Sequence, residues 1–136
     1  MSLSPILAVR KAIRTAIETM PQLQAYLKNR TIFDEAPSGL APPYSYFGET
    51  QLRDWSVDEA SGAEQFITLS VVTLHNGIAV AVNIGQQIVE RLNHAPLSLD
   101  DHSLIDISFI SMETRREQTG RLSKVNIRFR VTTEYQ

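Results

Sequence analysis

The stretch from residue 122 to residue 134 alternates strictly between apolar and polar side chains. The two sets are Val125, Ile127, Phe129 and Val131 on the apolar side, and Lys124, Asn126, Arg128 and Arg130 on the polar side. Because successive side chains of a β-strand point to opposite faces, this period of two predicts a strand with one buried and one wet side. Such a strand fits an antiparallel sheet that is covered on one face only.

Three more segments are predicted to be strands. Residues 104–115 precede the alternating strand, and Gln118-Thr119-Gly120 supplies a hairpin turn between the two. In this segment we expect Ile105, Ile107 and Phe109 to share one face. Residues 66–74 are rich in β-branched side chains, and residues 44–49 form a shorter strand.

Two helices are predicted from apolar spacing at three and four residues. The first begins with Ser4 as cap and Pro5 in the first turn, and Pro21 ends or breaks it. A further turn can follow over residues 23–27. The second helix follows the Asn76-Gly77 turn and runs to Leu92. Its apolar face is broad and includes Gly85, which predicts close packing against a sheet.

The predicted order is α-β-β-α-β-β in a single domain over residues 1–136. We expect an α+β fold with a four-stranded, mainly antiparallel sheet and both helices packed on one face. In residues 31–43, the residues Pro37, Ser38, Gly39, Pro42 and Pro43 mark an extended linker within the domain. The polar stretch 50–65 is either a long loop or the tip of a long hairpin.

The residues contain no recognisable catalytic, cofactor or metal site. The chain has no cysteine, no glycine-rich phosphate loop and no nucleophile elbow. His94 and His102 lie near Asp100 and Asp101, but their spacing matches no zinc signature. No apolar run is long enough for a membrane helix. We therefore expect neither an enzyme nor a cofactor.

Two groups of residues are candidates for binding a protein partner. They are Arg53, Asp54, Trp55, Asp58 and Glu59 in the polar stretch, and Arg115, Arg116, Arg128 and Arg130 on the last two strands. The basic residues suit phosphates, but no aromatic residue interleaves with them along the strand, as a single-strand binding platform requires. With a net charge of −2, we expect Arg128 and Arg130 to pair with acidic groups of the same or a neighbouring subunit. Local candidates are Glu113, Glu117 and Asp106.

The chain resembles the tail-terminator or tail-completion proteins of long-tailed phages and gene transfer agents, which are small head–tail junction proteins. The resemblance spans nearly the whole sequence and depends on the order and spacing of its motifs. These motifs are Phe33-Asp34-Glu35-Ala36-Pro37, the run from Pro43 to Glu49, Thr68-Leu69-Ser70-Val71-Val72, the Gly77-headed helix, Ile107-Ser108-Phe109 and the run from Asn126 to Val131. One departure is Val71-Val72, where the family often has an aromatic residue.

The resemblance implies a structural protein of a virion or phage-like particle, assembled in the bacterial host cytoplasm. It implies a homo-oligomeric ring, commonly a hexamer, that terminates the tail tube and joins it to a head-side connector or stopper protein. The tail-tube protein is then a second partner, and DNA passes through the ring without specific binding. Alternatives are another neck or tube ring subunit, such as a stopper or tube protein, or a small nucleic-acid- or ligand-binding α+β domain.

Overall fold

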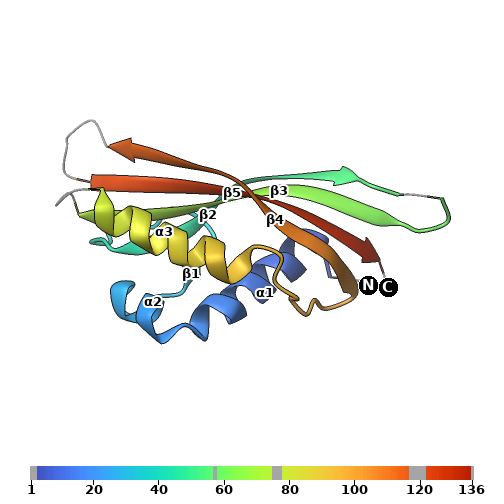
Figure 1. Ribbon diagram of the computed structural model, residues 1–136, viewed down its shortest axis with the longest axis horizontal. Helices are drawn as coiled ribbons and strands as arrows, with labels where there is room; N and C mark the ends of the chain where they lie inside the picture. Colours follow the sequence, from blue (N-terminus) through green and yellow to red (C-terminus); the bar gives the residue numbers. More distant parts are fainter. Residues whose placement is uncertain (1–2, 57, 75–77, 117–121, 136) are drawn as a thin grey trace.

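Three helices cover one face of a five-stranded sheet in this computed structural model, and no described helix or strand covers the other face (Figure 1). The structure describes residues 3–56, 58–74, 78–116 and 122–135. In chain order the elements are α1 (Pro5–Glu18), α2 (Pro21–Tyr26), β1 (Ile32–Phe33), β2 (Tyr44–Asp54), β3 (Gly62–Leu74), α3 (Ala79–Leu92), β4 (His102–Arg116) and β5 (Leu122–Tyr135). The strand order across the sheet is β1-β2-β3-β5-β4.

The α+β class and the single helical layer are confirmed, but the predicted four-stranded sheet and element order are wrong in detail. The additional strand is β1, whose Ile32 and Phe33 pair in parallel with Ser45 and Tyr46 of β2. The remaining pairs, β2/β3, β3/β5 and β4/β5, are antiparallel. A strand of two residues is too short to show a period, which is why the surrounding segment indicated only a linker. The additional helix is α2, which begins at Pro21 after α1 has ended.

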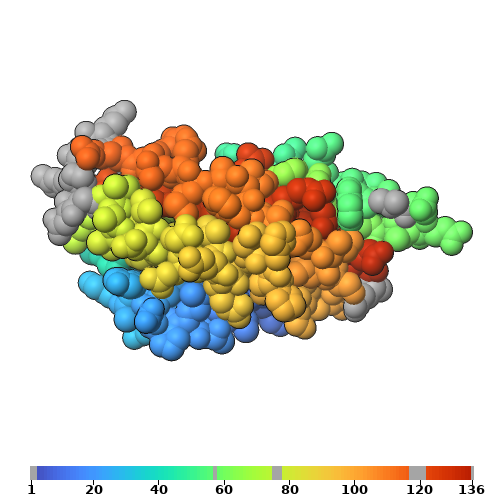
Figure 2. Space-filling view, viewed as in Figure 1, coloured from blue at the N-terminus to red at the C-terminus, as the bar shows by residue number. Residues whose placement is uncertain are grey.

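The polar stretch 50–65 is the tip of a long hairpin and not a long loop. β2 continues to Asp54 and β3 begins at Gly62, with Asp54 opposite Ala63 in the ladder. A register shift between Phe47 and Thr50 marks an irregularity in β2. We call residues 50–66 the arm. It extends beyond the helical layer at one end of the molecule, as the green segments of Figures 1 and 2 show.

Alternate residues of β5 lie on opposite faces of the sheet, as the sequence predicts. Val125, Ile127, Phe129 and Val131 are completely buried beneath the helices, whereas Arg128 is exposed. The helices contribute Ile13 and Ile17 of α1, Ile84 and Ile88 of α3, and Leu23 of α2 to the same core. This burial is the main source of folding free energy.

Helix α3 approaches the sheet closely at Gly85. A Cβ atom there would lie 3.2 Å from Met112 Cε, 3.2 Å from Val125 Cγ1 and 3.4 Å from Ile127 Cδ1. The absence of a side chain therefore allows the helix to sit directly on β4 and β5. The close packing that the broad apolar face predicts is confirmed.

Helix α1 begins as the sequence indicates, with the Ser4 hydroxyl accepting a hydrogen bond from the Ile6 N–H at 3.2 Å. Its polar side binds the chain around β1. Arg14 donates to the Ile32 carbonyl at 3.0 Å and forms an ion pair with Asp34, and Arg10 lies 3.3 Å from the same carboxylate. These guanidinium groups, Arg14 first, lower the pKa of Asp34 below its ordinary value.

The expected alternation of buried and exposed apolar side chains fails in β4. Ile107 is buried, but Ile105 is 47% exposed and Phe109 is 38% exposed. Register shifts lie between Leu104 and Asp106 and between Phe109 and Ser111, so that β4 has irregularities at two positions along the sheet edge. Such bulges re-aim side chains and protect an edge strand from pairing with other chains.

No helix within the described ranges is long and apolar enough to cross a membrane.

Candidate assembly surfaces

The uncovered face of the sheet, here called the outer face, carries cations that lie over aromatic rings. Lys124 Nζ lies 5.5 Å from the centre of the Tyr46 ring, and the Arg128 guanidinium lies 5.1 Å from that of Phe66. The Arg130 guanidinium lies 5.7 Å from the Trp55 ring. Each cation comes from β5, and its aromatic partner comes from another part of the chain. These distances are in the range of cation–π attraction.

The expectation that no aromatic residue interleaves with these charges is therefore wrong for the folded protein. The rings come from β2, from β3 and from the chain directly after β2, and the strand register brings them beside β5. Pairing places Phe66 opposite Arg130 and Ser70 opposite Asn126, with Tyr46 opposite Ser70. This neighbourhood is invisible along β5 alone, because aromatic and basic residues are separated by more than 50 positions in the sequence.

Arg130 has a carboxylate partner, but the partner is Glu64 and none of the local candidates. Arg130 Nε donates to Glu64 Oε2 at 2.6 Å, and Arg53 Nη1 lies 4.0 Å from the other oxygen of this carboxylate. Glu64 is 14% exposed, so the pair is partly shielded from water. The register explains the contact, because Glu64 and Arg130 lie on adjacent, directly paired strands.

For the local candidates, the structure records different partners. Glu113 lies 3.5 Å from Arg115, and Asp106 lies 2.8 Å from His94 Nδ1. The candidate Glu117 lies outside the described residues. Arg128 rests on Phe66, and the structure records no carboxylate partner for it within the described part of the chain. The expected ion pair of Arg128 is thus not observed among the described residues.

Two hollows lie beside these aromatic and charged residues. One has a volume of about 500 Å³ and is lined by Glu49, Thr50, Gln51, Phe66, Thr68 and Arg128. The second, of about 330 Å³, has a mainly apolar lining formed by Trp55, Ala60, Gly62, Ile105 and Glu134. Trp55, arginine and exposed apolar side chains are the residue types that dominate protein interfaces.

Gly62 allows close backbone packing next to the tip of the hairpin formed by β2 and β3. A Cβ atom at this position would lie 2.7 Å from the Trp55 carbonyl oxygen and 2.9 Å from the Thr133 carbonyl oxygen. The Trp55 N–H also donates to the Gly62 carbonyl at 2.9 Å. Any larger residue would push against backbone atoms, so glycine here holds Trp55 in place over the outer face.

The structure divides the nine candidate residues among separate places. Arg53 and Arg130 lie near Glu64 beside the arm tip, where Arg130 also lies over the Trp55 ring, and Arg128 lies farther along the same face. The acidic residues Asp54, Asp58 and Glu59 are exposed at the tip of the arm. Arg115 and Arg116 lie at the far end of β4, beside a hollow of about 330 Å³. The nine residues therefore do not form one site.

The His94–His102 region does not form a metal site in the described residues, where no cluster of three metal-binding side chains occurs. His102 is buried, with Nε2 2.6 Å from the Leu3 carbonyl oxygen, and Asp101 accepts a hydrogen bond from the Leu3 N–H at 2.8 Å. Asp100 pairs with Lys11 at 2.6 Å. These residues attach the start of the chain to the loop before β4.

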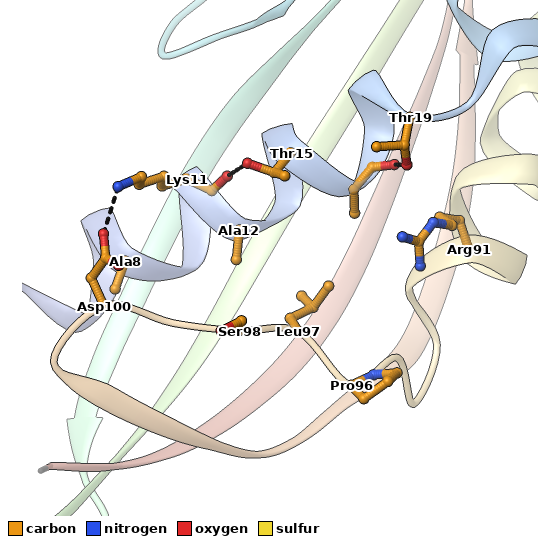
Figure 3. A pocket seen from close by; sticks show the side chains of 11 residues that line it. Ala8, Lys11, Ala12, Thr15, Thr19, Arg91, Pro96, Leu97, Ser98 and Asp100 are labelled. Carbon is orange, nitrogen blue, oxygen red and sulfur yellow. Dashed lines mark hydrogen bonds and ion pairs between the residues drawn. The ribbon is translucent and has the colours of Figure 1, made fainter.

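The helical side has one shallow groove, of about 220 Å³, between α1 and residues 96–100 (Figure 3). The Lys11–Asp100 ion pair closes one end of it, and Arg91 of α3 lies at the other (Figure 3). The Asp100 carboxylate raises the pKa of Lys11. The Thr15 and Thr19 hydroxyls donate hydrogen bonds to backbone carbonyl oxygens of α1, at 3.1 and 2.7 Å. The groove thus joins α1 to the loop and offers no set of reactive groups.

Comparison with known proteins identifies the kind of chain that this is similar to. The model of the family described as "Tail completion protein gp17" matches residues 11–134. A solved structure described as "Virion of native gene transfer agent (GTA) particle" contains a chain with a TM-score of 0.85 and 25% sequence identity. The match covers 98% of this chain and 99% of that one. A search of curated proteins by sequence finds no match.

Proposed function

This chain belongs to the tail completion protein gp17 family, and from this premise we propose that it forms a closed ring that ends the tail tube and joins it to the head. The family membership and the likeness to a chain of a gene transfer agent virion make it a structural protein of a tailed particle, not an enzyme. Its place is in the particle, among tail and head–tail components. The ring, its hexameric number and its position at the junction are our proposal.

The observation that carries the proposal is the likeness over essentially the full length of both chains, at a TM-score of 0.85. The sequence identity of 25% accompanies a shared arrangement of helices and strands, which supports the proposal that the two chains assemble in comparable ways.

The edges of the sheet support a ring of identical subunits. β4 forms one edge of the sheet. On the other edge, β1 pairs with only Ser45 and Tyr46, so among the described residues the arm part of β2 pairs with β3 on one side and has no strand on its other side. The two edges differ in sequence and shape. A contact that joins one edge of a subunit to a different surface of the next is heterologous, and such contacts close into rings when the rotation permits.

Deleting the gene tests the proposal. We expect the deletion strain to accumulate heads and tails that do not join, with tails of irregular length, and we expect joined particles to return when the gene is supplied in trans. Electron microscopy of purified particles should show a closed ring of this chain at the head-proximal end of the tube. Normal particles without the protein, or a single copy at the junction, would refute the proposal.

The same images separate the other ring proteins from a terminator. A tube protein would be repeated along the tail, and a stopper would lie between the terminator and the head. A peptide tag on the exposed residue Gln22 followed by gold labelling should mark one position per tail. Labels spaced along the whole tube would favour the tube alternative.

The nucleic-acid alternative predicts affinity for DNA. We expect weak binding, because cations cover the aromatic rings of the outer face and Glu64 offsets Arg130. Labelled duplex titrated at low and moderate salt measures this directly. Micromolar binding that falls with salt by a log–log slope of about −0.9 per phosphate contact, and that disappears in Arg128→Ala, would favour the nucleic-acid alternative.

A further inference from the structure

The sheet carries opposite charges at its two ends, and we propose that the acidic end of one copy of this chain binds the basic end of the next. The acidic end is the arm tip, residues 54–61, and the basic end is formed by Thr114–Arg116 of β4 and Leu122–Lys124 of β5. This inference rests on the proposed ring and names the contact that closes it.

The arm tip is purely acidic in its charged residues. Asp54, Asp58 and Glu59 are exposed, and the sequence from 54 to 61 contains no lysine, arginine or histidine. Of the nearest cations along the outer face, Arg130 lies 2.6 Å from Glu64, whereas the exposed Arg53 lies 4.0 Å from the same carboxylate, so the three carboxylates of the tip outnumber the one loosely held cation beside them. The negative charge of the tip is therefore left to attract a partner.

The basic end is exposed and hollowed. Arg115 lies opposite Lys124 in the β4/β5 ladder, and Arg116 follows on the same strand. A hollow of about 330 Å³ lies between Ile78, Thr114, Arg115, Arg116 and Ser123, and the Ile78 side chain is 37% exposed there. Glu113 reaches Arg115 only at 3.5 Å, and both side chains are more than 60% exposed. This contact leaves the guanidinium available to a stronger acidic partner.

One subunit cannot bring these ends together within itself. The β3/β5 ladder runs from Gly62 and Glu134 at the arm to Leu74 and Leu122 at the other end, with thirteen paired positions. At roughly 3.4 Å per residue the two ends are about 40 Å apart. The Debye length at physiological ionic strength is only about 8 Å, so the charges at the two ends do not attract each other within one subunit. Figure 1 shows the arm tip and the end of β4 at opposite ends of the long axis.

The partner is best identified as a second copy, because each copy supplies both halves of the contact. The described tip carries three carboxylates, and the described basic end carries three cations, Arg115, Arg116 and Lys124. A tip that binds the basic end of the next copy leaves one tip and one basic end free, whatever the number of copies. Only closure into a ring uses all of them.

Charge reversal tests this contact in particle assembly. The tip variant is Asp58→Lys with Glu59→Lys, the basic-end variant is Arg115→Glu with Arg116→Glu, and the third chain combines all four substitutions. Each is supplied to the deletion strain, and joined particles are counted by electron microscopy. We expect each single-end reversal to lower the count about tenfold or more, because like charges then face each other, and the combined chain to recover most of it.

A control matched to the tip variant makes the same change of net charge elsewhere. Glu18→Lys with Glu90→Lys alters two exposed carboxylates on the helices and should leave the count near that of the unmodified chain. Thermal unfolding of each purified variant verifies folding. Should a reversal prevent folding, the milder Asp58→Asn with Glu59→Gln replaces it, with an expected loss of about threefold.

The outcomes separate this inference from the proposed function. If the ring is visible and neither reversal lowers the count of joined particles, the proposed contact is overturned and the proposed ring stands. A folded combined chain that fails to recover would show that the two ends do not bind each other, which also overturns the inference. Absence of any ring in particles of the unmodified chain would refute the proposed function itself, independently of the variants.

Discussion

The two faces of the sheet use neighbouring residues of β5 for different purposes. On the inner face, Ile127 and Phe129 are completely buried under the helices. On the outer face, Arg128 and Arg130 lie over aromatic rings, and Arg130 also binds Glu64. The inner face contributes to stability through buried apolar area, which is large and insensitive to partner chemistry. The outer face contributes little to stability and keeps charged and aromatic groups accessible to other subunits.

The largest effect that tests this contrast is expected for Phe129→Ala. Phe129 is fully buried and its ring meets Phe109 edge-to-face at 6.2 Å. Removing it should lower the free energy of unfolding by roughly 3–5 kcal/mol, because a cavity remains where the ring was. Urea unfolding monitored by circular dichroism measures the loss. A loss below that of the outer-face variants would mean that the assignment of faces is reversed.

A smaller effect is expected where α3 touches the inner face. Gly85→Val would place methyl groups against Met112, Val125 and Ile127, which already lie within 3.4 Å of an added Cβ atom. We expect a loss of about 1–3 kcal/mol from overpacking. Gln86→Val, on the exposed side of the same helix, is the matched control for helix propensity. Equal stabilities of the two variants would contradict the close approach of helix and sheet.

On the outer face, Arg130→Ala should cost about 1 kcal/mol. The change leaves the partly shielded Glu64 carboxylate with only the more distant Arg53, yet Arg130 itself is 36% exposed and water screens the pair. A double-mutant cycle with Glu64→Gln separates the coupling from the individual losses. A coupling near zero would show that the ion pair does not act in the free protein.

The smallest effect is expected for Arg128→Ala. The side chain is exposed, and its recorded contact is with the Phe66 ring at 5.1 Å, so the loss should stay below about 0.5 kcal/mol. We expect the same variant to reduce the yield of joined particles if the hollow beside Phe66 faces another subunit. A stability loss as large as that of Arg130→Ala would remove the distinction between the two arginines.

Much of the fold could be predicted because its signals are local. The start of α1 follows from Ser4 and Pro5, and the burial of β5 follows from its alternation. β1 could not be predicted, because its two residues are strand only through pairing with β2. The exposure of Ile105 was also missed, since a bulge changes the alternation without changing the composition of the strand.

The candidate surface shows the same division. Composition drew attention to Arg130 and Trp55 separately, but nothing along the chain relates them to each other or to Glu64. The sequence also concealed how far the strands of the arm extend, because a polar hairpin exposed on both sides lacks the apolar period of a buried strand. Its length became apparent only from the pairing of Asp54 with Ala63.

The sequence by itself therefore determined α1, α3, the main strands and the sidedness of β5, because local periodicity decides which side chains can be buried. Only the tertiary structure decided which cation lies over which ring, which carboxylate Arg130 binds and which charged segments lie at opposite ends of the sheet. These features depend on register between strands that are far apart in the sequence; Glu64 and Arg130, for example, are separated by 66 residues. Register is set by how the whole inner face packs, and a one-residue shift would move every outer-face partner.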